Sequence, residues 1–357
     1  MKRCLLVIIT IILFSNVLAL DCNGTLLNKN SKLLNKNDGC PIENILPKDD
    51  AFHGIQSRFS IEWWYFDAVF DTHYGIHVGI KVISFGRWGF VKQLVNLYND
   101  SKVEEKAYIT KPLNQFQISK EFPDIRYNYK NLLEFDYEEY NKTGNWKYTV
   151  RVDVKNLAVN LTFVSETQGF KYETAHEGWT VAQPKAKVKG SLKIDDKIIK
   201  VKGKGYHDHN WNFSLSTGLR CKGWYWGKVN SENYTLTWAK IMKTHFADET
   251  IVKNLGVLNV INQGHEFIHP ENITFTASKR NFYHGRFIPT VFTLKIVQGK
   301  IEVNVTFNAV SIQRTPPNFL TVHYWRYFVS INGYIKMGGN VDYLDDDLQI
   351  IEFIRFI

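Results

Sequence analysis

Hydrophobic and polar residues alternate along most of this chain with a period of two. The pattern is clearest in residues 148–154, 157–164 and 301–307. Successive side chains of a β-strand point to opposite faces, so this alternation predicts strands with one buried face. Helical periodicity is nearly absent. The chain is therefore predicted to be all-β, with roughly 18 to 20 short strands.

Turn-forming residues separate these runs at short intervals, at 195–196, 230–233, 298–300 and 332–333. The last of these, Asn332-Gly333, stands between two strand-like segments and predicts a two-residue β-hairpin. The acidic run 345–347 predicts a further turn before a last strand, 348–357.

The strands are too many for one small sandwich, and the chain exceeds the usual size of a single core. Two antiparallel β-domains are therefore expected. The segment 184–190 is predicted to divide them, because it follows an aromatic-rich stretch and precedes a new series of strands. The predicted domains are 51–186 and 187–357, preceded by a polar lead-in, 20–50.

The first 19 residues are typical of a secretory signal. Lys2 and Arg3 precede the apolar run 4–18, and Val17-Leu18-Ala19 fits a cleavage site. The run is shorter than the roughly 20 residues that cross a bilayer. We expect a mature chain starting near Leu20 that is secreted or held at the cell surface.

Sequons for N-glycosylation support export, and eight are present. Asn212 adjoins a motif that is expected to be buried, so seven sites are predicted to be modified: Asn23, Asn99, Asn141, Asn160, Asn233, Asn272 and Asn304. The alternative is that an asparagine-rich chain collects sequons by chance. In an oxidising compartment, Cys22 and Cys40 are expected to form a disulfide that closes the lead-in. Cys221 is expected to be a buried, inert thiol.

The formal net charge is +9, spread along the chain. This distribution favours solubility or mild attraction to an anionic membrane or cell envelope, and not nucleic-acid binding. Aromatic residues are abundant, with 24 Phe, 18 Tyr and 10 Trp. Such a composition is typical of a large apolar cavity or of thick β-cores. A monomer is expected.

Two segments carry the candidate chemistry: the first motif, residues 62–66 (EWWYF), and the second motif, residues 203–211 (GKGYHDHNW). On an extended strand the second motif presents two polar faces. One face holds Tyr206, Asp208 and Asn210, and the other holds His207, His209 and Trp211. Polar groups that are buried in this way must be hydrogen-bonded, ligated or catalytic.

A carboxylic acid that burial keeps neutral can protonate an alkene in an apolar cavity. Asp208 fits this role, with Tyr206 on the same face, and Glu62 is a possible second carboxyl. The alternative is that Asp208 accepts hydrogen bonds and pins a strand junction.

His207 and His209 lie at i and i+2, where two imidazoles can share a zinc ion. A third ligand would have to come from His53, His77 or His176. Because His-x-His pairs are common and unspecific, no metal is predicted. No Ser-His-Asp arrangement, phosphate loop or dinucleotide motif is found at a usable spacing. No cofactor is therefore expected.

The two motifs, with residues 223–227 (GWYWG), resemble the hydroxyneurosporene synthase (carotenoid 1,2-hydratase)/AttH-like family from about residue 50 onward. The resemblance implies two lipocalin-like β-barrels packed together. Members include hydratases that add water to a terminal isoprenoid double bond without a cofactor, and pericyclases. An apolar, isoprenoid or polyene-like ligand is therefore expected, with a hydratase as one possible activity. A pericyclase-like catalyst and a non-catalytic binding or structural glycoprotein are the alternatives.

The resemblance also implies site residues. Tyr206 and Asp208 look similar to the catalytic tyrosine and aspartate of the hydratases. Trp179 matches the tryptophan of an upstream His-x-Trp pair, whereas Glu177 stands in place of the histidine and His176 lies one position earlier. The catalytic set is thus expected to be Asp208, Tyr206, Trp179 and His176. The predicted ligand-binding set is Glu62, Trp64, His207, His209, Trp211, Trp224 and Trp226.

Overall fold

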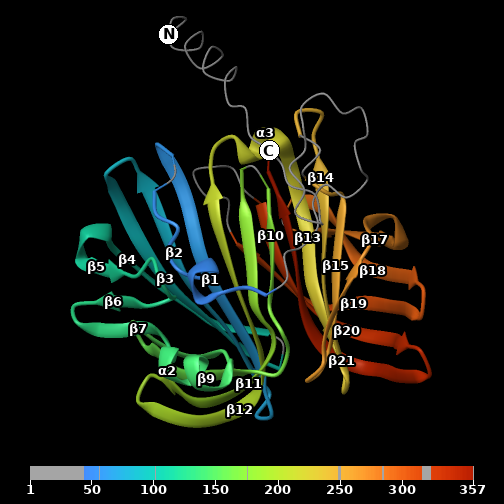
Figure 1. The fold of residues 1–357 in the computed structure, drawn as a ribbon, viewed down its shortest axis with the longest axis horizontal. Helices are drawn as coiled ribbons and strands as arrows, with labels where there is room; N and C mark the ends of the chain where they lie inside the picture. Colours follow the sequence, from blue (N-terminus) through green and yellow to red (C-terminus); the bar gives the residue numbers. More distant parts are fainter. Residues whose placement is uncertain are drawn as a thin grey trace, which may run out of the picture.

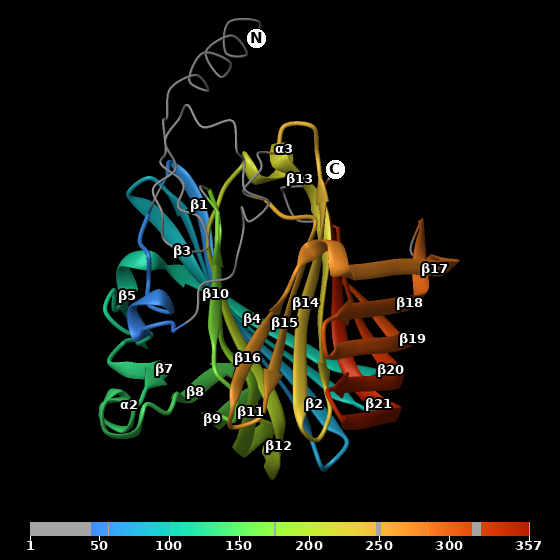
Figure 2. The same cartoon turned by 45° about the vertical axis from the view of Figure 1, so that its right-hand side comes forward.

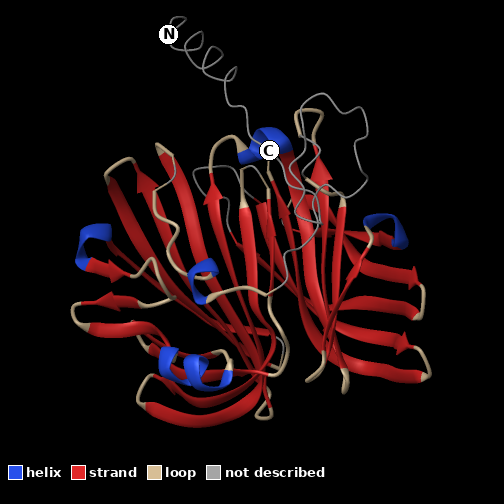
Figure 3. Ribbon diagram, viewed as in Figure 1, coloured by secondary structure: helices blue, strands red, loops and turns tan. Residues whose placement is uncertain are grey.

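The computed structural model describes residues 44–356 except 56, 101, 175, 248–250, 284 and 316–322. The predicted signal, Asn23, Cys22 and Cys40 lie outside this part of the chain. The described residues form two antiparallel β-sheets that curl into two barrel-like units (Figures 1 and 3). The prediction of an all-β chain with two lipocalin-like barrels is confirmed.

The first sheet has twelve strands and curls around one apolar core. Its strands in spatial order are β4 (Lys102–Pro112), β3 (Trp88–Asn99), β2 (Tyr74–Phe85), β1 (Phe59–Phe70), β12 (Lys197–Phe213), β11 (Gly178–Ile194), β9 (Leu157–Ser165), β8 (Lys147–Val154), β7 (Lys130–Phe135), β6 (Ile125–Tyr127) and β5 (Phe116–Ile118), with β10 (Phe170–Glu173) paired to β11. Three short helices accompany it: η1 (Pro47–Asp49), η2 (Leu113–Gln115) and α2 (Tyr137–Thr143).

The second sheet has nine strands and encloses a separate apolar core. Its strands in spatial order are β16 (Gly264–Ile268), β15 (Asn254–Val260), β14 (Tyr234–Lys243), β13 (Cys221–Asn230), β21 (Asn340–Arg355), β20 (His323–Met337), β19 (Ile301–Thr315), β18 (Arg286–Gln298) and β17 (Ile273–Tyr283). The helical turns α3 (Thr217–Arg220) and η3 (Pro270–Asn272) precede β13 and β17. No described helix is long and apolar enough to cross a membrane.

The chain passes from the first sheet to the second between β12 and β13. The boundary predicted near residue 186 instead falls inside β11, which pairs along its length with β12. Ala186, Val188 and Leu192 of β11 are buried in the first core, so the sheet cannot end before them. Residues 187–213, predicted to open the second domain, are therefore strands of the first sheet.

The hairpin predicted at Asn332-Gly333 is wrong. These residues lie inside β20, next to a bulge, and pair with Asp345 and Leu344 of β21. The acidic run 345–347, predicted as a turn, is likewise part of β21. At Gly333 a Cβ would lie 2.0 Å from the Asn304 carbonyl oxygen, so glycine serves close strand approach here. The observed β20–β21 turn is Gly338-Gly339.

The two sheets lie side by side, with β10 to β12 next to β14 to β16 (Figure 2). A third cluster of buried aromatic and aliphatic residues joins them. We call it the interface cluster: Tyr65, Phe170, Tyr172, Val181, Tyr206, Trp226, Ala239, Leu255 and Val257, with the partly buried Trp63, Trp179, Trp224, Val252 and Phe267 against it. Both sheets contribute to it, so the two barrels share a packed boundary.

Candidate functional site

The two motifs lie side by side, because β1 and β12 are antiparallel neighbours. Tyr65 is paired with Asp208, and Trp64 with His209. Trp64 packs in the first core, whereas Tyr65 belongs to the interface cluster. The alternation predicted for the second motif is thus observed. His207 and His209 face the inside of the first barrel, and Tyr206 and Asp208 face the second sheet.

The carboxyl group of Asp208 accepts hydrogen bonds from three side chains. Trp179 Nε1 and Tyr206 Oη both donate to Oδ2, at 2.9 and 2.8 Å. Asn210 Nδ2 donates to Oδ1 over a longer 3.3 Å. Trp179 comes from β11 and the other two from β12, so adjacent strands of one sheet hold the group in place. Oδ2 is saturated by two donors, which leaves Oδ1 to carry the proton of the neutral acid.

Burial raises the pKa of Asp208 from 3.8 to about 7, although the hydrogen bonds from Trp179 and Tyr206 act in the opposite direction. Burial, together with the nearby charge of Asp208, raises the pKa of Tyr206 well above its usual range. Tyr206 therefore remains a protonated donor. Asp208 is an acid whose proton is available near neutral pH.

Aromatic rings from both sheets surround this acid. Trp226 of β13 packs on Tyr206 with 5.1 Å between ring centroids, and lies 5.5 Å from the Tyr65 ring. Trp63, Trp179 and Trp224 keep part of their surface accessible beside the cluster. Tyr206, Tyr65 and Trp226 are buried, whereas Trp179, which bonds the acid, keeps part of its surface accessible. An acid beside such aromatic rings is typical of a site for an apolar ligand.

A buried ion pair that sequence reasoning missed lies next to the acid. Lys228 Nζ of β13 is 2.7 Å from Asp67 Oδ1 of β1, and Tyr65 Oη donates to Asp67 Oδ2 at 3.0 Å. The Lys228 ammonium also lies 4.8 Å from the centroid of the Tyr206 ring. Asp67 and Lys228 each follow a recognised motif by one residue. Their position next to the motifs was the only feature of the sequence that could have suggested a role for them.

His176, predicted to be catalytic, lies in the turn between β10 and β11, where its backbone N–H donates to Thr174 Oγ1. The next residue, Glu177, is paired with Arg220 and accepts a hydrogen bond from Thr217 at 2.8 Å. The structure therefore gives the glutamate that replaces the expected histidine a role in anchoring α3. Trp179, by contrast, reaches Asp208 directly.

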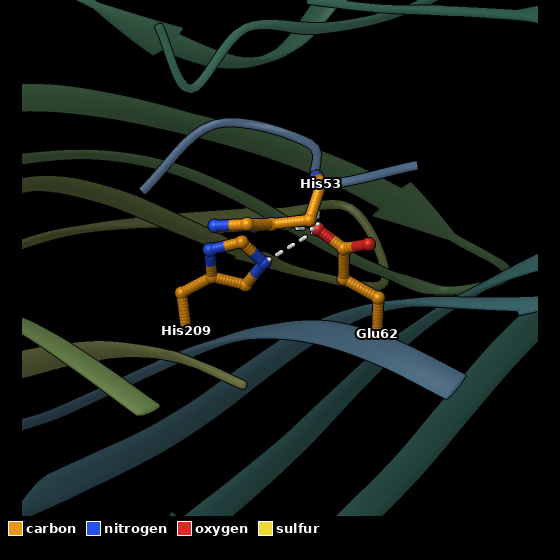
Figure 4. A group of neighbouring side chains, drawn as sticks. All are labelled: His53, Glu62 and His209. Carbon is orange, nitrogen blue, oxygen red and sulfur yellow. Dashed lines mark hydrogen bonds and ion pairs between the residues drawn. The ribbon is translucent and has the colours of Figure 1, made fainter. Parts of the chain in front are cut away.

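The other face of β12 carries two histidines, His207 and His209, that form polar contacts inside the first barrel. His207 Nε2 lies 2.9 Å from Asp50 Oδ2, which also accepts from Tyr148 Oη at 2.7 Å. His209 Nε2 lies 2.9 Å from Glu62 Oε1, beside His53 (Figure 4). Asp50 and Tyr148 were not predicted, because the contacts join distant segments, whereas His53 was considered as a possible third ligand beside the two histidines.

The seven predicted ligand-binding residues therefore fall into two groups. Trp224 and Trp226 lie at the interface between the sheets. The remaining five lie on the inner side of the first sheet: Glu62, Trp64, His207, His209 and Trp211. Trp64 stacks on His209 at 4.4 Å, and Trp211 stacks on His53 at 4.0 Å. The two groups thus lie on opposite sides of the first sheet, and their role in ligand binding stays a prediction.

The sequons of the described residues differ in exposure. Asn141, Asn160, Asn233 and Asn304 are exposed, whereas Asn99 and Asn272 are half-buried. Asn233 Nδ2 donates to Asp342 at 2.9 Å, and Asn272 Nδ2 donates to Gln298 at 3.1 Å. Glycosylation of these sites stays a prediction.

Comparison with known proteins gives the following. No family model matches the chain. A hydroxyneurosporene dehydrogenase from Chlorobaculum tepidum is 26% identical over 227 residues, which are 52% of this chain and 58% of that protein. An AttH-type protein from Nitrosomonas europaea has a similar structure, with a TM-score of 0.61 and 13% identity over 88% of this chain and 98% of that one.

Two further structures share the fold. Kievitone hydratase from Nectria haematococca has a TM-score of 0.56 at 11% identity, over 89% of this chain and 96% of that one. CghA, solved with Sch210972, has a TM-score of 0.55 at 9% identity, over 89% and 95%. The fold that this chain shares with these structures is that of a two-barrel, lipocalin-like protein. The resemblance to the hydroxyneurosporene synthase/AttH-like family is confirmed.

Proposed function

We propose that this protein binds an apolar, isoprenoid-type ligand between the two sheets and hydrates an alkene there without a cofactor, with Asp208 as the general acid. One observation carries this proposal: a buried carboxyl with a pKa raised to about 7 stands among aromatic rings, one of which, Trp179, is partly accessible. An acid that is protonated near neutral pH can give its proton to an uncharged substrate. The names of the relatives, a kievitone hydratase among them, are consistent with this chemistry.

The step balances with water as the only co-reactant. The Oδ1–H bond of Asp208 breaks, and the alkene π pair forms a C–H bond at the less substituted carbon. The resulting cation is stabilised by the faces of the neighbouring aromatic rings. Water then forms the C–O bond, and its extra proton returns to the Asp208 carboxylate. Alkene and water become an alcohol, and the enzyme is restored.

The hydrogen bonds to Oδ2 serve this cycle. Trp179 and Tyr206 donate to the carboxylate that forms when the proton leaves, and they remain in place when it returns. They therefore stabilise the charge that develops in the transition state. In this proposal Tyr206 positions the acid, and Trp179 shares that role.

A second candidate is a non-catalytic ligand-binding glycoprotein. It is favoured by the three donors on Asp208, since a carboxyl that accepts three hydrogen bonds also serves to pin β11 to β12. Export to the cell exterior is part of both candidates and rests on the signal and the sequons.

Substitution of Asp208 by Asn tests the proposal. The amide keeps the shape and accepts from Trp179 and Tyr206, but it has no acidic proton. We expect hydration of an acyclic isoprenoid with a terminal trisubstituted double bond, followed as ¹⁸O uptake from labelled water, to fall about 10²- to 10⁴-fold. The exposed Asp153→Asn is the matched control and should leave the rate unchanged. Hydration that persists in folded Asp208→Asn would exclude this mechanism. Tight binding without turnover by the wild-type protein would favour the second candidate.

A further inference from the structure

A cluster of metal-ligand side chains lies inside the first barrel, on the face of β12 that is turned away from Asp208. His53 comes from the segment before β1, Glu62 from β1 and His209 from β12, and Figure 4 shows the three side chains converging. Their ligand atoms all lie within 4.8 Å of one another. Glu62 Oε1 is 2.9 Å from His209 Nε2 and 3.4 Å from His53 Nδ1. His209 is 156 positions after His53 and 147 positions after Glu62 in the sequence, so the fold brings distant residues together.

We propose that His53, Glu62 and His209 bind a divalent transition-metal cation, with Zn²⁺ as the best fit. Two imidazoles and one carboxylate are a donor set that zinc favours over calcium or magnesium. Zinc–ligand bonds of about 2.1 Å place two ligand atoms about 3.0 to 3.4 Å apart, depending on the angle at the metal. The two separations from Glu62 Oε1, 2.9 and 3.4 Å, lie close to this range, and the two imidazole nitrogens lie within 4.8 Å of each other.

An unusual pair of buried atoms supports the proposal independently. His209 Nδ1 and Asp50 Oδ1 are 3.6 Å apart and fully buried, and neither has a hydrogen-bond partner among the described residues. If His209 carries its proton on Nε2 and donates to Glu62, two acceptors face each other at this point. Such burial of unsatisfied polar atoms costs free energy.

A bound cation resolves this conflict. With Nε2 of His209 on the metal, the ring proton resides on Nδ1 and is directed at Asp50 Oδ1. A carboxylate that accepts from the far nitrogen of a metal-bound histidine is a common support for such sites. Asp50 is itself fixed by Tyr148 and His207, so it is held ready for this role.

The surroundings suit a fixed site that is exposed only at His53. Trp64 stacks on His209 and Trp211 stacks on His53, so both imidazole rings are held in orientation. Glu62 and His209 are buried, and the His53 side chain is 20% exposed. A cation bound here would clip the segment before β1 onto β1 and β12. The proposal concerns a different face of β12 from the hydration site and does not depend on it.

The test uses full-length protein stripped of metal and then titrated with Zn²⁺ by calorimetry, and with Co²⁺ by visible absorption. We expect one equivalent to bind, with cobalt d–d bands typical of a low-coordinate N/O site, and a rise in Tm on adding Zn²⁺. His53→Ala removes one ligand from a partly exposed loop position, and Glu62→Gln removes the anionic ligand. The glutamine amide can still donate to His209 Nε2, so this variant should fold. Each should weaken binding about tenfold or more.

His73→Ala is the matched control, because the His73 side chain is exposed and its ion pair with the exposed Asp100 is 3.7 Å long. It should bind Zn²⁺ like the wild-type protein. Absence of 1:1 binding at micromolar Zn²⁺ would overturn the proposal and leave a hydrogen-bonded cluster. So would binding that survives both His53→Ala and Glu62→Gln in folded protein, since the cation would then reside elsewhere.

Discussion

At the scale of single residues, some contacts of the acid Asp208 could be predicted from the sequence and others could not. Tyr206 and Asp208 share a strand face, so period-two alternation was enough to place them together. Trp179 was predicted as a site residue only through the family resemblance. Lys228 and Asp67 could not be paired in advance, because their contact exists only after two sheets have packed together.

The raised pKa of Asp208 predicts a specific dependence of stability on pH. In the unfolded chain the group loses its proton near pH 3.8, whereas in the folded protein it keeps it up to about pH 7. Between these values the folded state binds more protons, so rising pH favours unfolding. We expect the contribution of Asp208 to the free energy of unfolding to fall by about 3 kcal/mol from pH 4 to pH 7.

Urea unfolding of wild-type protein and Asp208→Asn at several pH values measures this contribution. Burial also raises the pKa of Glu62, so the difference between the two proteins, and not the wild-type curve alone, isolates Asp208. The variant should gain relative stability as the pH rises to 7, with no further change above it. Parallel curves for the two proteins would show that the carboxyl is not held neutral by the fold.

At the scale of elements, local patterns predicted the strands well and their connections less well. The runs 148–154, 157–164 and 301–307 are strands as expected, and the turns at 195–196 and 299–300 are observed. The Asn332-Gly333 signal failed because pairing of β20 with both neighbours outweighs a local turn preference. The division near residue 186 failed for a similar reason, since pairing with β12 continues through it.

The second motif begins with glycines, and close packing of β12 against β1 explains why a side chain is not tolerated there. At Gly203 a Cβ would lie 2.1 Å from the backbone oxygen of Val69, which cannot move without disturbing the sheet. We expect Gly203→Ala to lower the free energy of unfolding by about 1–3 kcal/mol. Gly339→Ala, where nothing lies within 4 Å, is the control and should change it by less than about 0.5 kcal/mol. The free energy of unfolding of both variants is measured by chemical denaturation. Equal losses in the two variants would contradict the steric explanation.

At the scale of the whole molecule, buried polar contacts tie the two sheets together in addition to the interface cluster. Lys228 of β13 pairs with Asp67 of β1, and Lys185 Nζ of β11 donates to the Ser231 carbonyl at 2.9 Å. Arg326 of β20 lies 3.0 Å from His77 Nδ1 of β2. These contacts cross the boundary at separate places. We therefore expect the described barrels to unfold in one transition, although each has its own core.

Substitution of Lys228 by Met tests this coupling. It leaves the Asp67 carboxylate buried without its cation, which should cost about 3–5 kcal/mol. Lys202→Met is the matched control, because its ion pair with Asp71 is exposed and 3.5 Å long, so a loss below about 1 kcal/mol is expected. Unfolding is followed by tryptophan fluorescence and by circular dichroism. Similar losses in the two variants, or two separate transitions in the wild-type protein, would refute the coupling.

The position of β12 as a wall shared by two polar sites also bears on how this sequence can change. In most strands every second residue faces solvent and varies freely, so related sequences show an alternating pattern of tolerance. Between Tyr206 and Trp211, one set of side chains serves the acid and the next serves the histidine cluster. Almost no position in this stretch can then be substituted without affecting one of the two polar groups that β12 carries.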